Sequence, residues 1–258
     1  MMTLEIVQIP VLNDNYVYLL RDNASGKTAV VDPAVPEPVL AALQQRGWTL
    51  DVVLNTHHHG DHVGGNLALQ AATGCAIVGP RAEAPRIPGI ALQLGEGDSY
   101  ALGDSVAQVF DVPGHTAGHI AYWFTAAGAL FCGDTLFALG CGRLFEGTAA
   151  QMWTSLSKFL SLPDATRIYC AHEYTESNAR FAVTVEPGNG ALLARYDAIK
   201  ATRAKGLPTV PSTLGEERAT NPFLRPMSAN LRTTLGLESA DDVAVFAETR
   251  KRKDGFRG

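Results

Sequence analysis

Charged residues are scarce in this chain of 258 residues: Asp, Glu, Lys and Arg make up 18% of it, below the roughly 25% of an average soluble domain. The formal net charge of −5 provides no basic face, which argues against general binding to nucleic acids or anionic membranes. With 46% apolar residues, the chain is too apolar to be disordered and can bury a large core. Its length suits one large domain, or one domain with a small appendage.

Export and membrane signals are also missing. The N-terminus, MMTLEIVQIPVLNDNY, has no basic start followed by an apolar run, so it does not resemble a signal peptide. The longest apolar stretch without Pro or His, residues 121–132, is shorter than the ~20 residues that a membrane span needs. The four cysteines form no CxxC pair, and we expect reduced, mostly buried thiols. These absences predict a cytoplasmic protein that does not bind membranes.

Short apolar runs bounded by Gly, Pro, Asn or Asp predict strands in the first two-thirds of the chain. The expected strands are Leu4–Ile9, Tyr16–Leu20, Thr28–Val31, Asp51–Asn55, Cys75–Val78, Val106–Val112, Ile120–Phe124, Ala129–Cys132 and Arg167–Cys170. The expected helices there are Glu37–Arg46, Asn66–Ala72 and Ala149–Ser161, the last opened by a capping box from Thr148 to Gln151. After about Tyr174 we expect no strand, and helices over Thr175–Val185, Ala191–Lys205, Ala229–Leu235 and Ala240–Lys253. A strand-rich domain followed by a helical appendage is predicted.

The segment NTHHHGDHVGG, residues 55–65, follows one expected strand and precedes one expected helix. It contains His57, His59, Asp61 and His62 as potential metal ligands. His57 and His59 are two residues apart, so in an extended loop they project to the same side, while Asp61 and His62 can reach a second nearby position. Imidazole and carboxylate ligands suit zinc, iron or manganese. Four donors this close together favour a metal site over a polar loop whose histidines bond only to the backbone.

Three further potential ligands, His115, Asp134 and His172, each follow an expected strand, where the loops of a strand-based fold gather a site. Taken alone, Asp134 is typical of a turn, but the common placement of all three favours one site. His58 is left out of the ligand set because both its neighbours are better placed. His119, which enters the next expected strand, is assigned to hydrogen bonding near the site instead of metal binding.

These residues resemble the THxHxDH signature of the metallo-β-lactamase superfamily, here residues 56–62. The resemblance covers about residues 1–172 and implies an α+β fold, a four-layered αββα sandwich with a two-metal site at one edge of its sheets. It also implies the ligands: His57, His59 and His115 for the first metal, Asp61, His62 and His172 for the second, and Asp134 bridging both. Zinc is the expected metal, with iron or manganese as alternatives.

Over nearly its whole length the chain is similar to the glyoxalase II (hydroxyacylglutathione hydrolase) family. The matching stretches are NDNYVYLL (13–20), CGDTLFALGCGRLFEGTAAQM (132–152), CAHEYTESNARF (170–181), NPFLR (221–225) and RKRKDGF (250–256). The similarity implies a catalytic domain over residues 1–173 and a small all-helical substrate-binding domain over 174–258. It implies hydrolysis of S-(2-hydroxyacyl)glutathione thioesters, with S-D-lactoylglutathione giving D-lactate and glutathione in the second step of methylglyoxal detoxification.

The same similarity implies the substrate contacts. The family's glutathione-binding basic residue falls on Arg143, and its aromatic residue two positions later on Phe145, which lacks the hydroxyl of the frequent Tyr. Tyr174 matches the Tyr after His-Glu, and Arg250 with Lys253 matches the C-terminal basic pair. If residues 240–253 are helical, the pair shares a face and can anchor a glutathione carboxylate. A solvated basic helix end, favoured by the helix dipole, is the alternative.

The implied chemistry is attack of a bridging hydroxide, held by Asp61 and Asp134, on the thioester carbonyl. Glutathione thiolate leaves without a strong general acid, because thiols have a pKa of about 8.5. Three alternatives remain: a glutathione persulfide dioxygenase with one iron, a nuclease of the same superfamily, and a non-catalytic metal-binding protein. Residues 249–258 sum to +4, which leaves −9 for the rest of the chain and disfavours the nuclease. No coiled-coil pattern is visible, so we expect a monomer.

Overall fold

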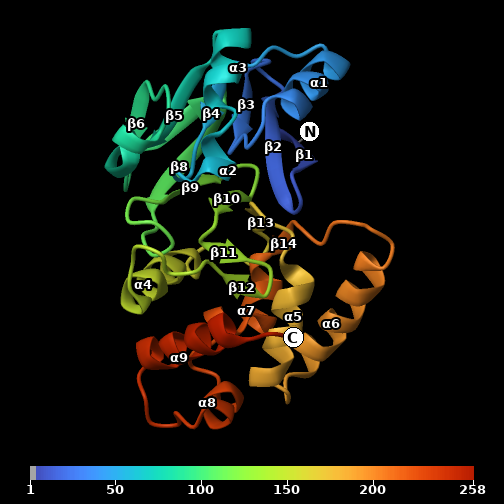
Figure 1. Cartoon of the computed structure of the whole chain (residues 1–258), viewed down its shortest axis with the longest axis vertical. Coiled ribbons are helices and arrows are strands. Elements are labelled where there is room, and N and C mark those ends of the chain that lie inside the picture. The colour runs from blue at the N-terminus through green and yellow to red at the C-terminus, as the bar shows by residue number, and fades with distance from the viewer. Residues whose placement is uncertain (1–3) are drawn as a thin grey trace. The chain divides into compact units, whose positions relative to one another are not determined.

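The computed structural model describes residues 4–258, so the first three residues of the predicted catalytic domain lie outside the described part. The chain divides into two compact units. The first contains the residues up to Asp111 and Ala117–Gly133, and the second contains Val112–Thr116 and Asp134–Gly258. Figure 1 shows the elements of both. Among the helices of residues 4–258, none has both the length and the hydropathy for crossing a membrane.

The first unit is built on a six-stranded sheet. Its strands, in sequence order and in spatial order, are β1 (Leu4–Val11), β2 (Asn15–Asp22), β3 (Thr28–Val31), β4 (Val52–Leu54), β5 (Ala76–Pro80) and β6 (Leu92–Leu94). Strands β1 to β3 are antiparallel, and β3 to β6 are parallel. The runs TAVV of β3 and VVL of β4 are buried along their whole length, as expected for strands covered on both faces.

Helices α1 (Glu37–Arg46) and α3 (Asn66–Thr73) cover one face of this sheet, where their apolar side chains pack with alternate strand residues such as Leu19. Both helices end at a glycine in the left-handed conformation, Gly47 and Gly74. Glycine suits these positions because it has no Cβ to clash there. Helix α1 ends where expected, and α3 ends one residue later than expected.

A second, antiparallel sheet packs on the other face of the first one. In the first unit it consists, in spatial order, of β10 (Ala129–Gly133), β9 (Ile120–Phe124), β8 (Ser105–Asp111) and β7 (Ser99–Leu102). Tyr18 of β2 contacts Phe131 of β10, with ring centroids 5.5 Å apart. The Tyr122 hydroxyl of β9 donates a hydrogen bond to the backbone carbonyl of Asn55, just after β4. Because strand side chains alternate, Tyr18 faces this sheet while its neighbours on β2 face the helices.

The second unit is mainly helical. Its helices are α4 (Ala149–Phe159), α5 (Thr175–Val185), α6 (Gly190–Arg203), α7 (Leu214–Thr220), the 3-10 helix η2 (Pro222–Leu224), α8 (Ala229–Leu235) and α9 (Asp242–Gly255). Its strands form two short antiparallel pairs, β11 (Leu136–Phe137) with β12 (Gly140–Cys141) and β13 (Arg167–Cys170) with β14 (Ser212–Thr213). The Phe246 ring of α9 contacts those of Trp153 in α4 and Phe223 in η2, which ties the C-terminal helix to the rest of the unit.

The α+β class is confirmed, and every expected strand and helix has a counterpart. The capping box of Thr148 and Gln151 is present, and all four cysteines are buried thiols outside any disulfide. The expectation of no strand after Tyr174 is wrong, because β14 pairs with β13; its two residues are too few to show alternation. Helix α7 has no counterpart among the expected helices. The domain boundary between residues 173 and 174 stays a prediction.

Candidate metal centre

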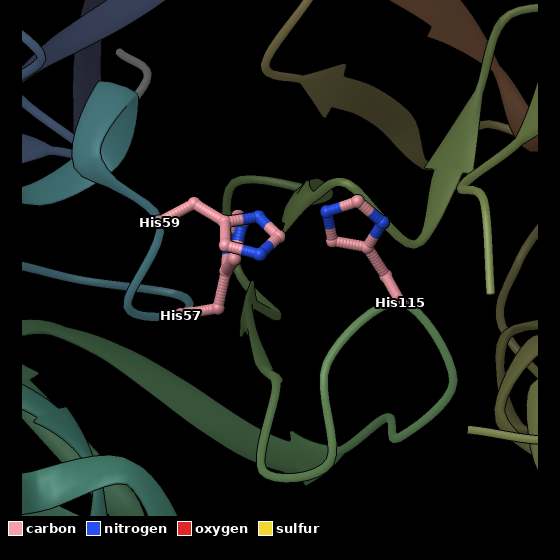
Figure 2. A group of neighbouring side chains, drawn as sticks. All are labelled: His57, His59 and His115. Carbon is pink, nitrogen blue, oxygen red and sulfur yellow. The ribbon is translucent and has the colours of Figure 1, made fainter. Parts of the chain in front are cut away.

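Four of the seven expected ligands lie in the first unit, in the loop after β4 and in the short helix α2 (Gly60–Val63). We call His57, His59, Asp61 and His62 the first donor group. The His57 Nε2 and His59 Nδ1 atoms are 3.1 Å apart, and the His62 Nε2 atom is 3.5 Å from Oδ2 of Asp61. Figure 2 shows His57 and His59 leaving the same stretch of chain with their rings close together. The structure thus gathers all four side chains in one short segment, the loop after β4 and helix α2.

Asp32, at the end of β3, supports this loop and is absent from the predicted site. Its carboxylate accepts hydrogen bonds from the backbone N–H (2.8 Å) and the hydroxyl (2.7 Å) of Thr56, and Oδ2 lies 3.1 Å from Nδ1 of His62. A carboxylate on one ring nitrogen orients the other nitrogen toward a metal. The donor atoms of Asp32, His57 and His62 all lie within 4.8 Å of one another. In the sequence, the one signal for Asp32 is its position directly after the expected strand Thr28–Val31.

The two histidines left out of the predicted ligand set have other partners. The His58 backbone N–H donates to Glu83 Oε2, and its Nδ1 lies 2.7 Å from the same oxygen. The His119 ring stacks on that of His57, with centroids 4.5 Å apart and an angle of 17° between the planes. Its Nδ1 is 2.9 Å from the Ile120 carbonyl oxygen. Both residues therefore brace the loop that carries the first donor group.

His115, Asp134 and His172 lie in the second unit, and we call them the second donor group. Nε2 of His115 is 3.3 Å from Oδ2 of Asp134, and Nε2 of His172 is 3.4 Å from Oδ1. One carboxylate oxygen therefore faces each imidazole, an arrangement that lets Asp134 contribute one oxygen to each of two ions. His115, drawn in Figure 2 on the loop after β8, has Nδ1 2.9 Å from the Arg143 carbonyl oxygen. The Tyr174 ring stacks on His172, with centroids 4.7 Å apart and planes 3° from parallel.

The spacing within each donor group fits metal ligation. Four nitrogen–nitrogen or nitrogen–oxygen distances in the two groups fall between 3.1 and 3.5 Å. Ligands about 2.0–2.2 Å from a tetrahedral ion lie about 3.3–3.6 Å from one another, and slightly closer around an octahedral one. Imidazole with carboxylate is a donor set for zinc, iron and manganese. The residues present therefore fit divalent transition-metal ions.

The C-terminal basic pair on α9 occupies two different environments. Arg250 is only 5% exposed; its guanidinium donates to the Cys141 carbonyl (2.9 Å) and to Asp254 Oδ1 (2.8 Å). Lys253 is partly exposed, and its Nζ donates to the carbonyl (3.1 Å) and hydroxyl (3.3 Å) of Ser177 in α5. The Lys253 ammonium is therefore the more accessible of the two charges.

Lys253 lies in a cationic region of the second unit. Burial, together with the positive charges of Arg250, Arg180 and Arg143, lowers its pKa to about 8. An anion bound at Lys253 would stabilise the charged ammonium, so the region suits a carboxylate ligand. Arg143 is exposed, and so is Phe145, whose ring lies 5.2 Å from that of His115. The predicted basic and aromatic substrate contacts thus lie beside the second donor group.

Two family models together match nearly the whole chain. Residues 12–172 match the metallo-β-lactamase superfamily, and residues 173–256 match the C-terminus of hydroxyacylglutathione hydrolase. A protein of Methylococcus capsulatus named hydroxyacylglutathione hydrolase is 63% identical over 99% of this chain and 100% of its own length, and one of Rhodospirillum rubrum with the same name is 56% identical with the same coverage. The chain belongs to the hydroxyacylglutathione hydrolase family. This membership confirms the expected metallo-β-lactamase fold with an added C-terminal part.

Solved structures with lower sequence identity to this chain share the fold. ETHE1 from Myxococcus xanthus aligns with 98% of this chain and 100% of its own, with a TM-score of 0.67 and 27% identity. The di-iron-bound form of TTHA1623 aligns with 85% of this chain and 100% of its own, with a TM-score of 0.62 and 26% identity. A related fold therefore holds two iron ions in that second protein.

Proposed function

We propose that the chain hydrolyses S-(2-hydroxyacyl)glutathione thioesters, with S-D-lactoylglutathione giving D-lactate and glutathione in the second step of methylglyoxal detoxification. The observation that carries the proposal is the 51–63% identity, over 99% of the chain, to proteins named hydroxyacylglutathione hydrolase. The donor groups and the cationic region around Lys253 support it, because they supply what the reaction needs: metal ligands and an anchor for an anionic substrate.

We propose zinc as the metal, two ions per chain, from the family's pattern and the donor chemistry. The ligands are His57, His59 and His115 for the first ion, Asp61, His62 and His172 for the second, and Asp134 for both. When bound, the ions supply a water of lowered pKa and a Lewis acid for the thioester carbonyl. Asp61 and Asp134 have their own part in this chemistry: their carboxylate oxygens accept hydrogen bonds from the attacking water and orient it.

The helical part of the second unit is proposed to bind the glutathione portion. Lys253 and Arg143 attract its carboxylates, and the buried Arg250 adds positive charge while its hydrogen bonds hold the Cys141 carbonyl. Tyr174 and Phe145 offer aromatic surface beside His172 and His115. The leaving thiol has a pKa of about 8.5, so thiolate departs without a protein acid. Binding energy from this remote portion positions the thioester for attack.

The proposal is tested by steady-state assays on a panel of glutathione thioesters, with metal analysis of the same sample. We expect release of thiol from S-D-lactoylglutathione that chelation abolishes and zinc restores. Hydrolysis of none of the thioesters by zinc-loaded protein would overturn the assignment. We also propose a cytoplasmic monomer, which fractionation of cells and light scattering of the purified protein would test.

A further inference from the structure

A hydrogen bond joins the first hairpin of the chain to the first donor group. The side-chain amide of Asn15, at the start of β2, donates from Nδ2 to Oδ2 of Asp61 at 3.0 Å. The two residues are 46 positions apart, so only the fold brings them together. Asn15 itself is 6% exposed. This buried amide can therefore influence the orientation of an expected metal ligand.

The two partners differ in how firmly the structure holds them. Asn15 is paired with Val11 in the β1–β2 ladder, and the turn between them contains Leu12 in the left-handed region, with a φ of 52°. Such a tight turn leaves the backbone at Asn15 little freedom. The Asp61 side chain, in contrast, is 38% exposed and lies on a helix of only four residues. The backbone that carries the amide is therefore fixed, and the Asp61 carboxylate is the less buried of the two partners.

We propose that Asn15 is a positioning residue. Its amide fixes the rotation of the Asp61 carboxylate and thereby raises the affinity of the second metal position for its ion. The inference deepens the function proposed above and depends on it for the identity of the metal position. Asn15 does this without adding charge, so the carboxylate keeps its full negative charge for a cation. Asp32 orients His62 in the same way: its Oδ2 lies 3.1 Å from Nδ1 of that histidine.

Residues that orient metal ligands affect metal affinity by about 10- to 100-fold when they are replaced. Loss of the Asn15 amide should therefore weaken the binding of one zinc ion of the two, and leave the other unchanged. A misplaced Asp61 also orients the attacking water less well, so kcat should fall. KM should stay unchanged, because the amide acts on Asp61, which is not one of the proposed glutathione contacts.

The experiment compares Asn15→Leu, which keeps the branching at Cγ and removes the donor, with Asn15→Ala, which serves if the bulkier Leu variant does not fold. Asn13→Leu and Asn13→Ala are matched controls, since Asn13 is an exposed asparagine of the same turn. Zinc affinities are measured by competition with a chromophoric chelator, melting temperatures by circular dichroism, and kcat and KM with S-D-lactoylglutathione.

The inference predicts about 10- to 100-fold weaker binding of one zinc ion and a lower kcat in the Asn15 variants, with the Asn13 variants like the wild type. Unchanged zinc affinities would overturn it, and so would equal weakening of both ions together with a lower melting temperature, which indicates general damage to the fold. If the wild type hydrolyses no thioester, the proposed function fails, while the zinc titrations still decide the role of Asn15.

Discussion

Alkaline pH should weaken substrate binding through Lys253. The pKa of this lysine is lowered to about 8 by burial and by neighbouring arginines, so its positive charge is present at pH 7 and is lost as the pH rises through 8. A glutathione carboxylate is attracted only by the protonated form. The lowered pKa therefore predicts a KM that is constant below neutrality and increases above pH 8.

The size of the effect follows from the pKa. If only the protonated enzyme binds, KM is multiplied by one plus the ratio of neutral to charged Lys253. That factor is about 1.1 at pH 7 and about 11 at pH 9, so KM should rise by up to about 10-fold between them. A neutral lysine that still donates a hydrogen bond to the carboxylate would make the increase smaller.

The assay measures kcat and KM for S-D-lactoylglutathione from pH 6.5 to 9. Lys253→Arg is the matched control, because an arginine stays charged throughout this range while the substrate's own amino group titrates equally with both enzymes. The KM of the Lys253→Arg variant for S-D-lactoylglutathione should stay nearly constant from pH 6.5 to 9, apart from the effect of the substrate's amino group. A wild-type KM that does not change up to pH 9, or the same pH dependence in Lys253→Arg, would refute the assignment of this group.

Three other predictions concern single side chains. Asp134→Ala should lower bound zinc and kcat together, because its two oxygens face two imidazoles; metal analysis beside the assay checks this, and full metal content would contradict it. Arg250→Met should cost about 1–3 kcal/mol of unfolding free energy, measured in urea, since the Cys141 carbonyl loses its buried donor. Tyr174→Phe should keep the stacking on His172 and nearly full kcat, whereas Tyr174→Ala should reduce it; equal rates would argue against a role for the ring.

The sequence pattern predicted most of the strands and most of the helices because their signals are local. Buried runs such as that of β3 are continuous and apolar, and the ends of α1 and α3 are marked by glycine. Shorter elements such as β14 carry no such pattern, because two residues cannot show a period. They form through pairing with a strand from elsewhere in the chain, which local sequence does not reveal.

The candidate site was predictable where potential ligands cluster in the sequence, as in residues 57–62. Asp32 and Asn15 were not, since each acts on a ligand through a contact that exists only in the folded chain. The C-terminal tail shows the same limit. Helical spacing could predict only that Arg250 and Lys253 share a face of the helix. It could not indicate that the Arg250 guanidinium is buried against a backbone carbonyl.

The most direct test of a two-metal thioester hydrolase is a zinc titration of the metal-free protein, followed by release of thiol from S-D-lactoylglutathione. The account predicts that hydrolysis increases until two zinc ions are bound per chain and then stays constant, with D-lactate and glutathione formed in equal amounts. Protein with two bound zinc ions that releases no thiol would contradict it.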